Sequence, residues 1–210
     1  MADFKRSDVE IDEDRAAWRG FFQVREYRLR HRLYKGGWGR WLSRELFVRG
    51  PAVGVLPYDP VLDCILQVEQ FRVGAMNRSA SPWIAELVAG IIDKPDESPE
   101  DVARREALEE AGIDIQEMEA IAEYYSSPGG SDEYFYLYCG RANLATAGGF
   151  FGLAEEGEDI YAKVMSFTDA MAMLDAGQVS SAHNLIALQW LRLNRDALRQ
   201  RWLAWATPVR

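Results

Sequence analysis

The sequence predicts a mixed α/β or α+β fold in which a sheet is layered between helices, with a small antiparallel β module in front of it. Apolar, strand-like segments surround a central helical segment, and they occupy residues 52–57, 64–73, 84–92, 134–140 and 160–167. Helical signals mark residues 99–111, 168–177 and 181–205. Strands on both sides of a central helix, followed by C-terminal helices, are typical of layered α/β architectures.

The N-terminal 50 residues have a different pattern. Residues 21–33 alternate apolar and charged side chains, a Gly-rich turn follows, and residues 41–49 form a second strand-like run. This pattern predicts an antiparallel hairpin, preceded by a mobile lead-in over residues 1–20. We place a domain boundary between residues 50 and 51, which gives a β module (1–50) and a main domain (51–210). Because a two-stranded sheet is marginal by itself, we expect this module to pair in a homodimer.

Composition excludes several kinds of partner. The chain has 210 residues and a formal net charge of −9, which argues against nucleic acid or an anionic membrane as a partner. Cys64 and Cys139 both lie in apolar runs, as buried free thiols would. The N-terminus is polar, and no apolar run approaches the ~20 residues of a membrane helix. We therefore expect a cytoplasmic protein.

The central helix is bounded by strong local signals. Ser98 is suited to cap its N-terminus, Pro99 to occupy the first turn, and Asp101 to complete a capping box. The helix is expected to end near Ala111, with Gly112 as a left-handed stop.

Three glutamates share one face of this helix. Glu106, Glu109 and Glu110 stand at positions i, i+3 and i+4, and Arg105 is the one basic residue well placed to offset their repulsion. A hard divalent cation relieves such repulsion directly, because clustered carboxylate oxygens are what Mg²⁺ prefers. A solvated acidic surface is the alternative interpretation of the same spacing.

At these residues the sequence resembles the Nudix box, the signature of the Nudix hydrolases. The matching positions are Gly90, Glu97, Arg105, Glu106, Glu109, Glu110, Gly112 and Ile113. Six residues separate Gly90 from Glu97, where the family pattern has five, and the extra one falls in the turn before the helix. Even six fixed residue types at this spacing, each at a frequency of roughly 6%, recur by chance in only about one in 10⁵ chains of this length at average composition. The resemblance implies a mixed sheet sandwiched between helices and a Mg²⁺ cofactor, with Mn²⁺ as a substitute.

The resemblance also implies roles for individual residues. Glu106 and Glu110 would be metal ligands. Glu109 would be a further ligand and also a catalytic residue, and Arg105 would orient these carboxylates during catalysis. Glu97 would brace the preceding loop or touch metal. The implied metal site is completed by the carbonyl group of Ala89 and the side chain of Glu158. Glu156, in the acidic stretch 152–160, occupies the position of the catalytic base.

Outside the box, most of the chain resembles the bacterial ADP-ribose pyrophosphatases of this family, tellurite-resistance-type members included. The shared stretches are RGFF (19–22), SRELFVRG (43–50), VEQFR (68–72), SSPGGSDE (126–133), GLAEEGEDI (152–160) and IALQWL (186–191). Phe21 or Phe22 would stack on a base, or simply pack within the strand. Cationic side chains would hold phosphates, or instead form ion pairs. The full set of candidate substrate contacts is Phe21, Phe22, Arg44, Glu45, Arg49, Arg72, Ile91, Ser127, Pro128, Gly129 and Glu133.

The function that these residues favour is Mg²⁺-dependent hydrolysis of the diphosphate bond of ADP-ribose to AMP and ribose 5-phosphate. The first alternative is hydrolysis of another nucleoside diphosphate sugar, such as GDP-mannose. The second is a non-catalytic Nudix domain that senses a nucleotide. A third is a protein–protein adaptor that uses the Trp-rich C-terminal helix, and it predicts no diphosphatase activity.

Overall fold

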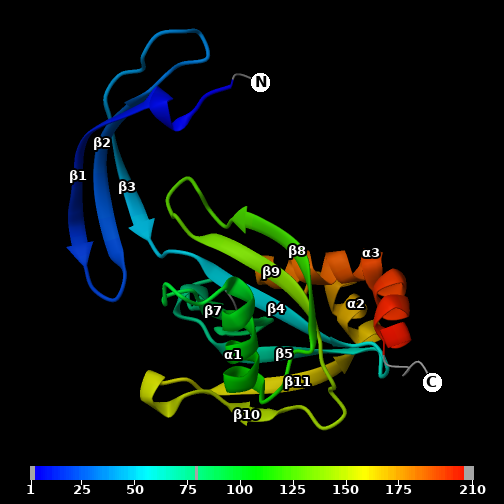
Figure 1. The fold of residues 1–210 in the computed structure, drawn as a ribbon. Helices are drawn as coiled ribbons and strands as arrows, with labels where there is room; N and C mark the ends of the chain where they lie inside the picture. Colours follow the sequence, from blue (N-terminus) through cyan, green and yellow to red (C-terminus); the bar gives the residue numbers. More distant parts are fainter. Residues whose placement is uncertain (1–2, 79, 206–210) are drawn as a thin grey trace. The chain divides into compact units, whose positions relative to one another are not determined.

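The computed structural model describes residues 3–78 and 80–205, and the chain divides into two compact units (Figure 1). The first unit takes in Met1–Pro51 and Tyr125–Tyr134, and the second Ala52–Tyr124 and Phe135–Arg210. The segment Tyr125–Tyr134 therefore packs with the N-terminal module, although it follows the central helix in the sequence.

The first unit contains an antiparallel sheet in the order β1-β2-β3, formed by Val9–Arg19, Gln23–His31 and Leu42–Val48, with the short helix η1 (Arg6–Asp8) before it. The predicted hairpin is thus present. The expectation of a mobile lead-in over residues 1–20 is wrong for residues 6–19, which form η1 and β1, and its first two residues lie outside the described part of the chain. Acidic side chains of β1 form ion pairs with arginines of β2: Glu10 with Arg30, Asp12 with Arg28 and Asp14 with Arg25. These cross-strand pairs add a third strand to a hairpin that is marginal by itself.

The segment Tyr125–Tyr134 is tied to the end of β3. The amide of Phe47 donates to the carbonyl oxygen of Gly130 over 2.8 Å. The Asp132 carboxylate accepts from the backbone amides of Arg49 (2.7 Å) and Gly50 (3.1 Å). These bonds fix the backbone on both sides of Arg49.

The second unit contains a mixed sheet that is eight-stranded within the described residues. Its main order is β10-β11-β5-β4-β9-β8, with β6 paired to β5 and β7 paired to β4. The strands are β4 (Ala52–Asp59), β5 (Cys64–Phe71), β6 (Trp83–Glu86), β7 (Val88–Ile91), β8 (Glu117–Tyr125), β9 (Tyr134–Arg141), β10 (Gly149–Phe151) and β11 (Ile160–Ser166). β4 and β9 run parallel. The pairs β10–β11, β11–β5, β4–β5, β4–β7 and β5–β6 are antiparallel.

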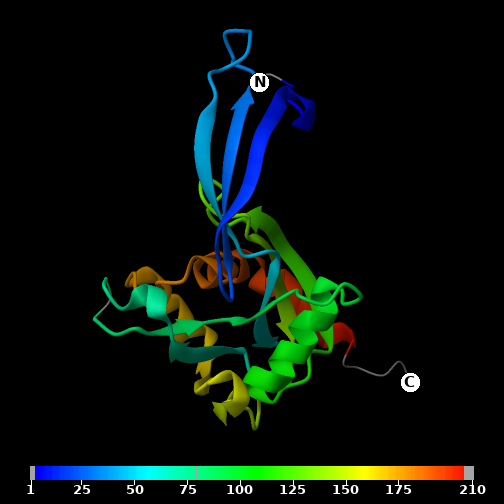
Figure 2. The same ribbon diagram turned by 90° about the vertical axis from the view of Figure 1, so that its left-hand side faces the viewer.

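Helices cover both faces of this sheet (Figure 2). Val53 and Val55 of β4 pack in one core cluster with α1 (Pro99–Ala111). Leu56 and Tyr58 of the same strand pack in the second cluster with α2 (Phe167–Asp175) and α3 (Ala182–Trp205). Side chains alternate between the faces of a strand, so one buried strand supplies both cores. The predicted fold class, a mixed sheet between helices, is confirmed.

The predicted boundaries of α1 are confirmed. The hydroxyl of Ser98 accepts from the Asp101 amide over 3.2 Å, and the Asp101 carboxylate accepts from the Ser98 amide over 3.3 Å. Gly112 ends the helix with φ 63°, in the left-handed region. β8 was not predicted, and the apolar run over residues 84–92 divides into two strands, β6 and β7. Short 3₁₀ helices, η2 (Val73–Ala75) and η3 (Ala154–Glu156), follow β5 and β10. None of the helices in the described ranges is long and apolar enough to span a membrane.

Candidate active site

Glu110 is the most deeply buried of the three helix glutamates, with 3% of its surface exposed. One carboxylate oxygen accepts from the backbone amide of Ala89 in β7 over 3.1 Å. The other accepts from the side-chain amide of Gln70 in β5 over 3.4 Å. Burial raises the pKa of Glu110 to about 8, against the opposing effect of the Ala89 amide, and the neighbouring carboxylates of Glu106 and Glu158 add to the rise.

Glu106 lies one turn earlier on α1 and packs against Gly90. A Cβ atom on Gly90 would lie 2.2 Å from the Oε1 atom of Glu106, so this approach requires a glycine. Burial raises the pKa of Glu106 to about 7, while the adjacent Arg105 guanidinium opposes the rise. The carboxylates of Glu109 and Glu158 raise that pKa further.

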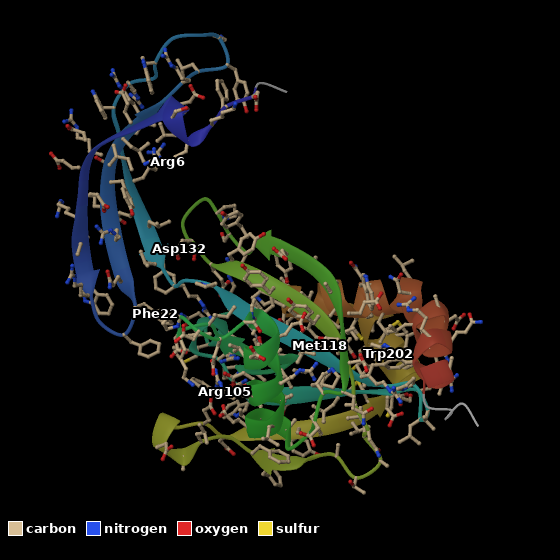
Figure 3. The ribbon with its side chains drawn as sticks, in the orientation of Figure 1. Arg6, Phe22, Arg105, Met118, Asp132 and Trp202 are labelled. Atoms are coloured by element: carbon tan, nitrogen blue, oxygen red, sulfur yellow. The ribbon has the colours of Figure 1, made fainter. Side chains whose placement is uncertain are left out.

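Arg105, which is labelled in Figure 3, forms ion pairs with three of the acidic side chains. Its Nη1 atom lies 2.8 Å from Glu106 Oε1 and 3.0 Å from Glu109 Oε2. Its Nη2 atom lies 3.5 Å from Glu97 Oε2, and Lys94 Nζ lies 3.4 Å from the other oxygen of Glu97. The planar guanidinium therefore holds the helix carboxylates against the loop that precedes the helix.

Glu158 comes from the acidic loop between β10 and β11. Its carboxylate accepts from the Leu153 amide over 3.1 Å, and the backbone at Gly152 (φ 104°) passes so close that a Cβ atom there would lie 2.8 Å from the Cβ of Glu158. Its effect on the pKa of both Glu106 and Glu110 places it in their electrostatic neighbourhood. The backbone of Glu156 ends η3, but its side chain lies outside the described part of the structure.

These carboxylates fit a hard divalent cation by their chemistry. Burial first, and then the charges of neighbouring carboxylates that include Glu158, raise the pKa of both Glu106 and Glu110, and Glu97 Oε2 is buried without a hydrogen-bond donor. Oxygen-only donor sets of this kind suit Mg²⁺. Among the described residues, no three His, Cys, Asp or Glu side chains converge as a ready-made metal site. Their oxygens instead face Arg105, Gln70 and the amides of Ala89 and Leu153.

Arg72 follows β5 in the same unit. Its Nε atom donates to Glu86 Oε2 over 2.7 Å, and its positive charge opposes the rise in the Glu110 pKa that burial causes. Ile91, another predicted contact, ends β7 opposite Ala52 of β4. The structure thus brings Arg72, Glu110 and their neighbours together in the second unit.

The remaining predicted substrate contacts belong to the first unit. Phe22 packs against Phe47 with ring centroids 5.0 Å apart, and the Arg49 guanidinium lies 5.7 Å from the Phe22 ring centroid. Arg49 Nε lies 2.6 Å from Glu133 Oε1. Phe21 has 88% of its surface exposed. This small cluster places a cation beside an aromatic surface. An aromatic ring can stack on a nucleotide base and a cation can bind its phosphate groups.

Other predicted contacts of this unit are more dispersed. Arg44 and Glu45 point from β3 opposite Tyr27 and Glu26, and both are exposed. Ser127, Pro128 and Gly129 form an exposed turn that closes through the Ser127 carbonyl oxygen, which accepts from the amides of Gly130 and Ser131.

Sequence reasoning missed Gln70 and Glu86, which contact Glu110 and Arg72. Both lie in segments with the pattern of ordinary apolar strands. Gln70 is 40 residues from its partner Glu110 in the sequence, and Glu86 is 14 residues from its partner Arg72. A polar side chain inside an otherwise buried strand was the available signal, since such groups need a partner.

The fold and the site together define a class: a mixed sheet between helices, with an acidic helix face suited to cations. Comparison with known proteins makes the class specific, because the NUDIX domain model matches residues 48–188. The chain belongs to the Nudix family.

Relatives extend the similarity beyond the domain. The chain is 43% identical over 199 residues to the ADP-ribose pyrophosphatase of Escherichia coli (strain K12), covering 95% of each chain. It is 39% identical over 202 residues to the ADP-ribose pyrophosphatase of Haemophilus influenzae, covering 95% of this chain and 93% of that one. The GDP-mannose pyrophosphatase of Enterobacter sp. (strain 638) is 32% identical over 156 residues, covering 72% and 78%.

A solved structure supports the fold. A crystal structure of an ADP compounds hydrolase superposes with a TM-score of 0.68 at 20% identity, covering 91% of this chain and 97% of that chain.

Proposed function

We propose that this protein hydrolyses the diphosphate bond of ADP-ribose with Mg²⁺, releasing AMP and ribose 5-phosphate. The observation that carries the proposal is the set of mutually repelling carboxylates Glu106, Glu110 and Glu158, whose burial and proximity suit a divalent cation. The names of the relatives that match along 93–95% of their length favour ADP-ribose as the substrate.

Each residue has a role in this proposal. Glu106, Glu110 and Glu158 hold Mg²⁺ together with the carbonyl oxygen of Ala89. When bound, Mg²⁺ neutralises charge on the diphosphate and lowers the pKa of water. Arg105 keeps the helix carboxylates in place, and Glu109 and Glu97 complete its ion-pair network.

The proposed chemical step is hydrolysis of the diphosphate by a water molecule. The water oxygen forms a bond to a phosphorus atom of the diphosphate, and Glu156 accepts its proton. The bond from that phosphorus to the bridging oxygen breaks, and the leaving phosphate keeps the electron pair. Negative charge develops on the phosphate oxygens in the transition state, and nearby cations stabilise it. Such electrostatic stabilisation is usually the largest single contribution to the rate enhancement of an enzyme.

Each substrate contact has a role in the proposal. Arg72 and Arg49 bind phosphate oxygens, Phe21 or Phe22 stacks on the base, and the backbone amides of the Ser127–Gly129 turn contact the terminal ribose. Arg44, Glu45, Ile91 and Glu133 are the further proposed contacts. We also propose that the protein is a cytoplasmic homodimer whose N-terminal module, residues 1–50, serves dimerisation, while residues 51–210 carry the hydrolase.

A panel of nucleoside diphosphate sugars with Mg²⁺ tests the function. We expect ADP-ribose to give the highest kcat/KM, with AMP and ribose 5-phosphate as products by chromatography. A preference for GDP-mannose would move the assignment to the activity named for the more distant relatives. Nucleotide binding without turnover of any panel member would make the protein a sensor.

A further inference from the structure

Arg72 is held by one edge of its guanidinium. The Nε atom donates to Glu86 Oε2 over 2.7 Å, and Glu86 is the more buried partner, with 18% of its side chain exposed against 44% for Arg72. Nη1 and Nη2 of Arg72 donate no hydrogen bond to the described residues. An arginine fixed at Nε keeps its plane and aims its remaining N–H groups in a set direction.

The backbone beneath Glu86 is itself fixed. Glu86 pairs with Val68 across β5 and β6, and the preceding carbonyl group, that of Ala85, accepts from the Asn184 side chain over 3.2 Å. Asn184 is fully buried on α3 and also accepts from Gln67 of β5 over 3.0 Å. At the other end, the Arg72 amide donates to the Pro82 carbonyl oxygen over 2.8 Å. Arg72 and Glu86 therefore lie at different positions along one anchored hairpin, and the Arg72 side chain reaches along it to Glu86.

Electrostatics alone gives no reason for Glu86 at this place. Its negative charge lies beside a cation that is expected to bind phosphate, and it offsets the charge of that cation. A carboxylate there weakens the attraction for an anionic ligand. Its benefit must come from orientation, because an arginine with 44% of its side chain exposed otherwise samples many rotamers.

We propose that Glu86 is a positioning residue that orients the Arg72 guanidinium toward the diphosphate of the substrate. The proposal rests on the proposed function for its substrate. It assigns Glu86 no contact with the reacting atoms. Orientation and charge predict opposite signs: loss of Glu86 weakens binding if orientation dominates and strengthens it if charge dominates.

Steady-state kinetics with ADP-ribose and saturating Mg²⁺ test this idea. We expect Glu86→Ala to raise KM about tenfold, the equivalent of about 1.4 kcal/mol, with kcat within about twofold. Glu86→Gln should recover most of the loss, because its amide oxygen still accepts from Arg72 Nε. The matched control is Glu69→Ala, which removes an exposed glutamate from the same hairpin and should leave KM unchanged. Thermal unfolding of each variant separates these effects from a loss of folded protein.

A double-mutant cycle makes the coupling explicit. Arg72→Ala should raise KM further than Glu86→Ala, and the double variant should be no worse than Arg72→Ala. A lower KM in Glu86→Ala, or additive effects in the double variant, would overturn the proposal.

The same cycle is measured without turnover, by calorimetric binding of ADP in the absence of Mg²⁺. If the wild-type protein binds ADP but releases no AMP from ADP-ribose, the proposed function is refuted. The double-mutant cycle for ADP binding then still tests the role of Glu86. Coupling between positions 72 and 86 supports the proposal in that case. Absence of ADP binding, or its independence of both residues, refutes it.

Discussion

The Glu106 carboxylate lies directly on the backbone of Gly90. A Cβ atom at Gly90 would meet Oε1, Cδ and Cγ of Glu106 at 2.2, 2.3 and 2.4 Å. Real Cβ contacts are never that close, so the glutamate of α1 and the glycine of β7 form one geometric unit. Gly90 therefore leaves free the space that the carboxylate of Glu106, sixteen residues later in the chain, occupies.

We expect Gly90→Ala to displace Glu106 and reduce kcat by about 10²-fold, the usual cost of misplacing a catalytic group by about 1 Å. The fold should persist, because the Glu106 side chain is free to rotate away. Kinetics and circular dichroism are the measurements. Gly74→Ala is the control, since a Cβ atom there meets no atom within 4 Å. Full activity of Gly90→Ala would mean that Glu106 does not need its present position.

Glu110→Gln separates charge from packing. Glutamine keeps the shape and accepts from the Ala89 amide, but it removes a carboxylate that is costly to bury. We expect turnover to be lost and the melting temperature to hold or rise. Glu100→Gln, on the exposed side of the first turn of α1, should change neither. Persistent Mg²⁺-dependent activity in Glu110→Gln would contradict the role given to this residue.

Local chemistry made part of this molecule predictable. The ends of α1 follow from Ser98, Pro99 and Gly112, whose effects act within one helical turn. The shared face of Glu106 and Glu110 follows from helical spacing alone. The ends of α1 and the shared face of its glutamates depend only on residues close together in the sequence, and the structure has both features.

Other features depend on partners far away in the sequence. β1 is acidic and looked like a mobile lead-in, because its stability depends on arginines of β2 that its own composition does not reveal. The contact of Gln70 with Glu110 could not be predicted either, because the two residues are 40 positions apart in the sequence. The roles of individual site residues remain predictions, since family patterns name them and no bound ligand tests them.

The buried polar pair Asn184–Gln67 supports α3 against the sheet. Asn184→Ala removes the acceptor of Gln67 and the donor to Ala85, leaving buried groups without partners. We expect the free energy of unfolding to fall by about 2 kcal/mol or more, measured by urea denaturation. Gln189→Ala, at an exposed position of the same helix, is the control and should change stability little. Equal stability of both variants would contradict this prediction.

The last prediction concerns pH and the Asp63–Arg195 pair, which links the β4–β5 turn to α3. Arg195 and the Tyr58 hydroxyl both donate to Asp63, and these bonds, Arg195 first, lower the Asp63 pKa below its ordinary value of 3.8 despite partial burial. A lowered folded-state pKa contributes stability that is complete above the unfolded pKa and is lost as pH falls through the folded one. We expect Asp63→Asn to lower the free energy of unfolding at pH 7 by about 1–3 kcal/mol.

The difference from wild type should shrink below about pH 4, where the unfolded-state carboxyl is protonated. Asparagine is the right replacement because residue 63 has φ 56°, a left-handed conformation that asparagine tolerates. The control is Asp196→Asn, whose carboxylate also contacts Arg195 but is 91% exposed, so its loss should have little effect. Urea denaturation from pH 3 to 8 decides: a difference between Asp63→Asn and wild type that stays constant over this range would show that the Asp63 charge is not the stabilising element.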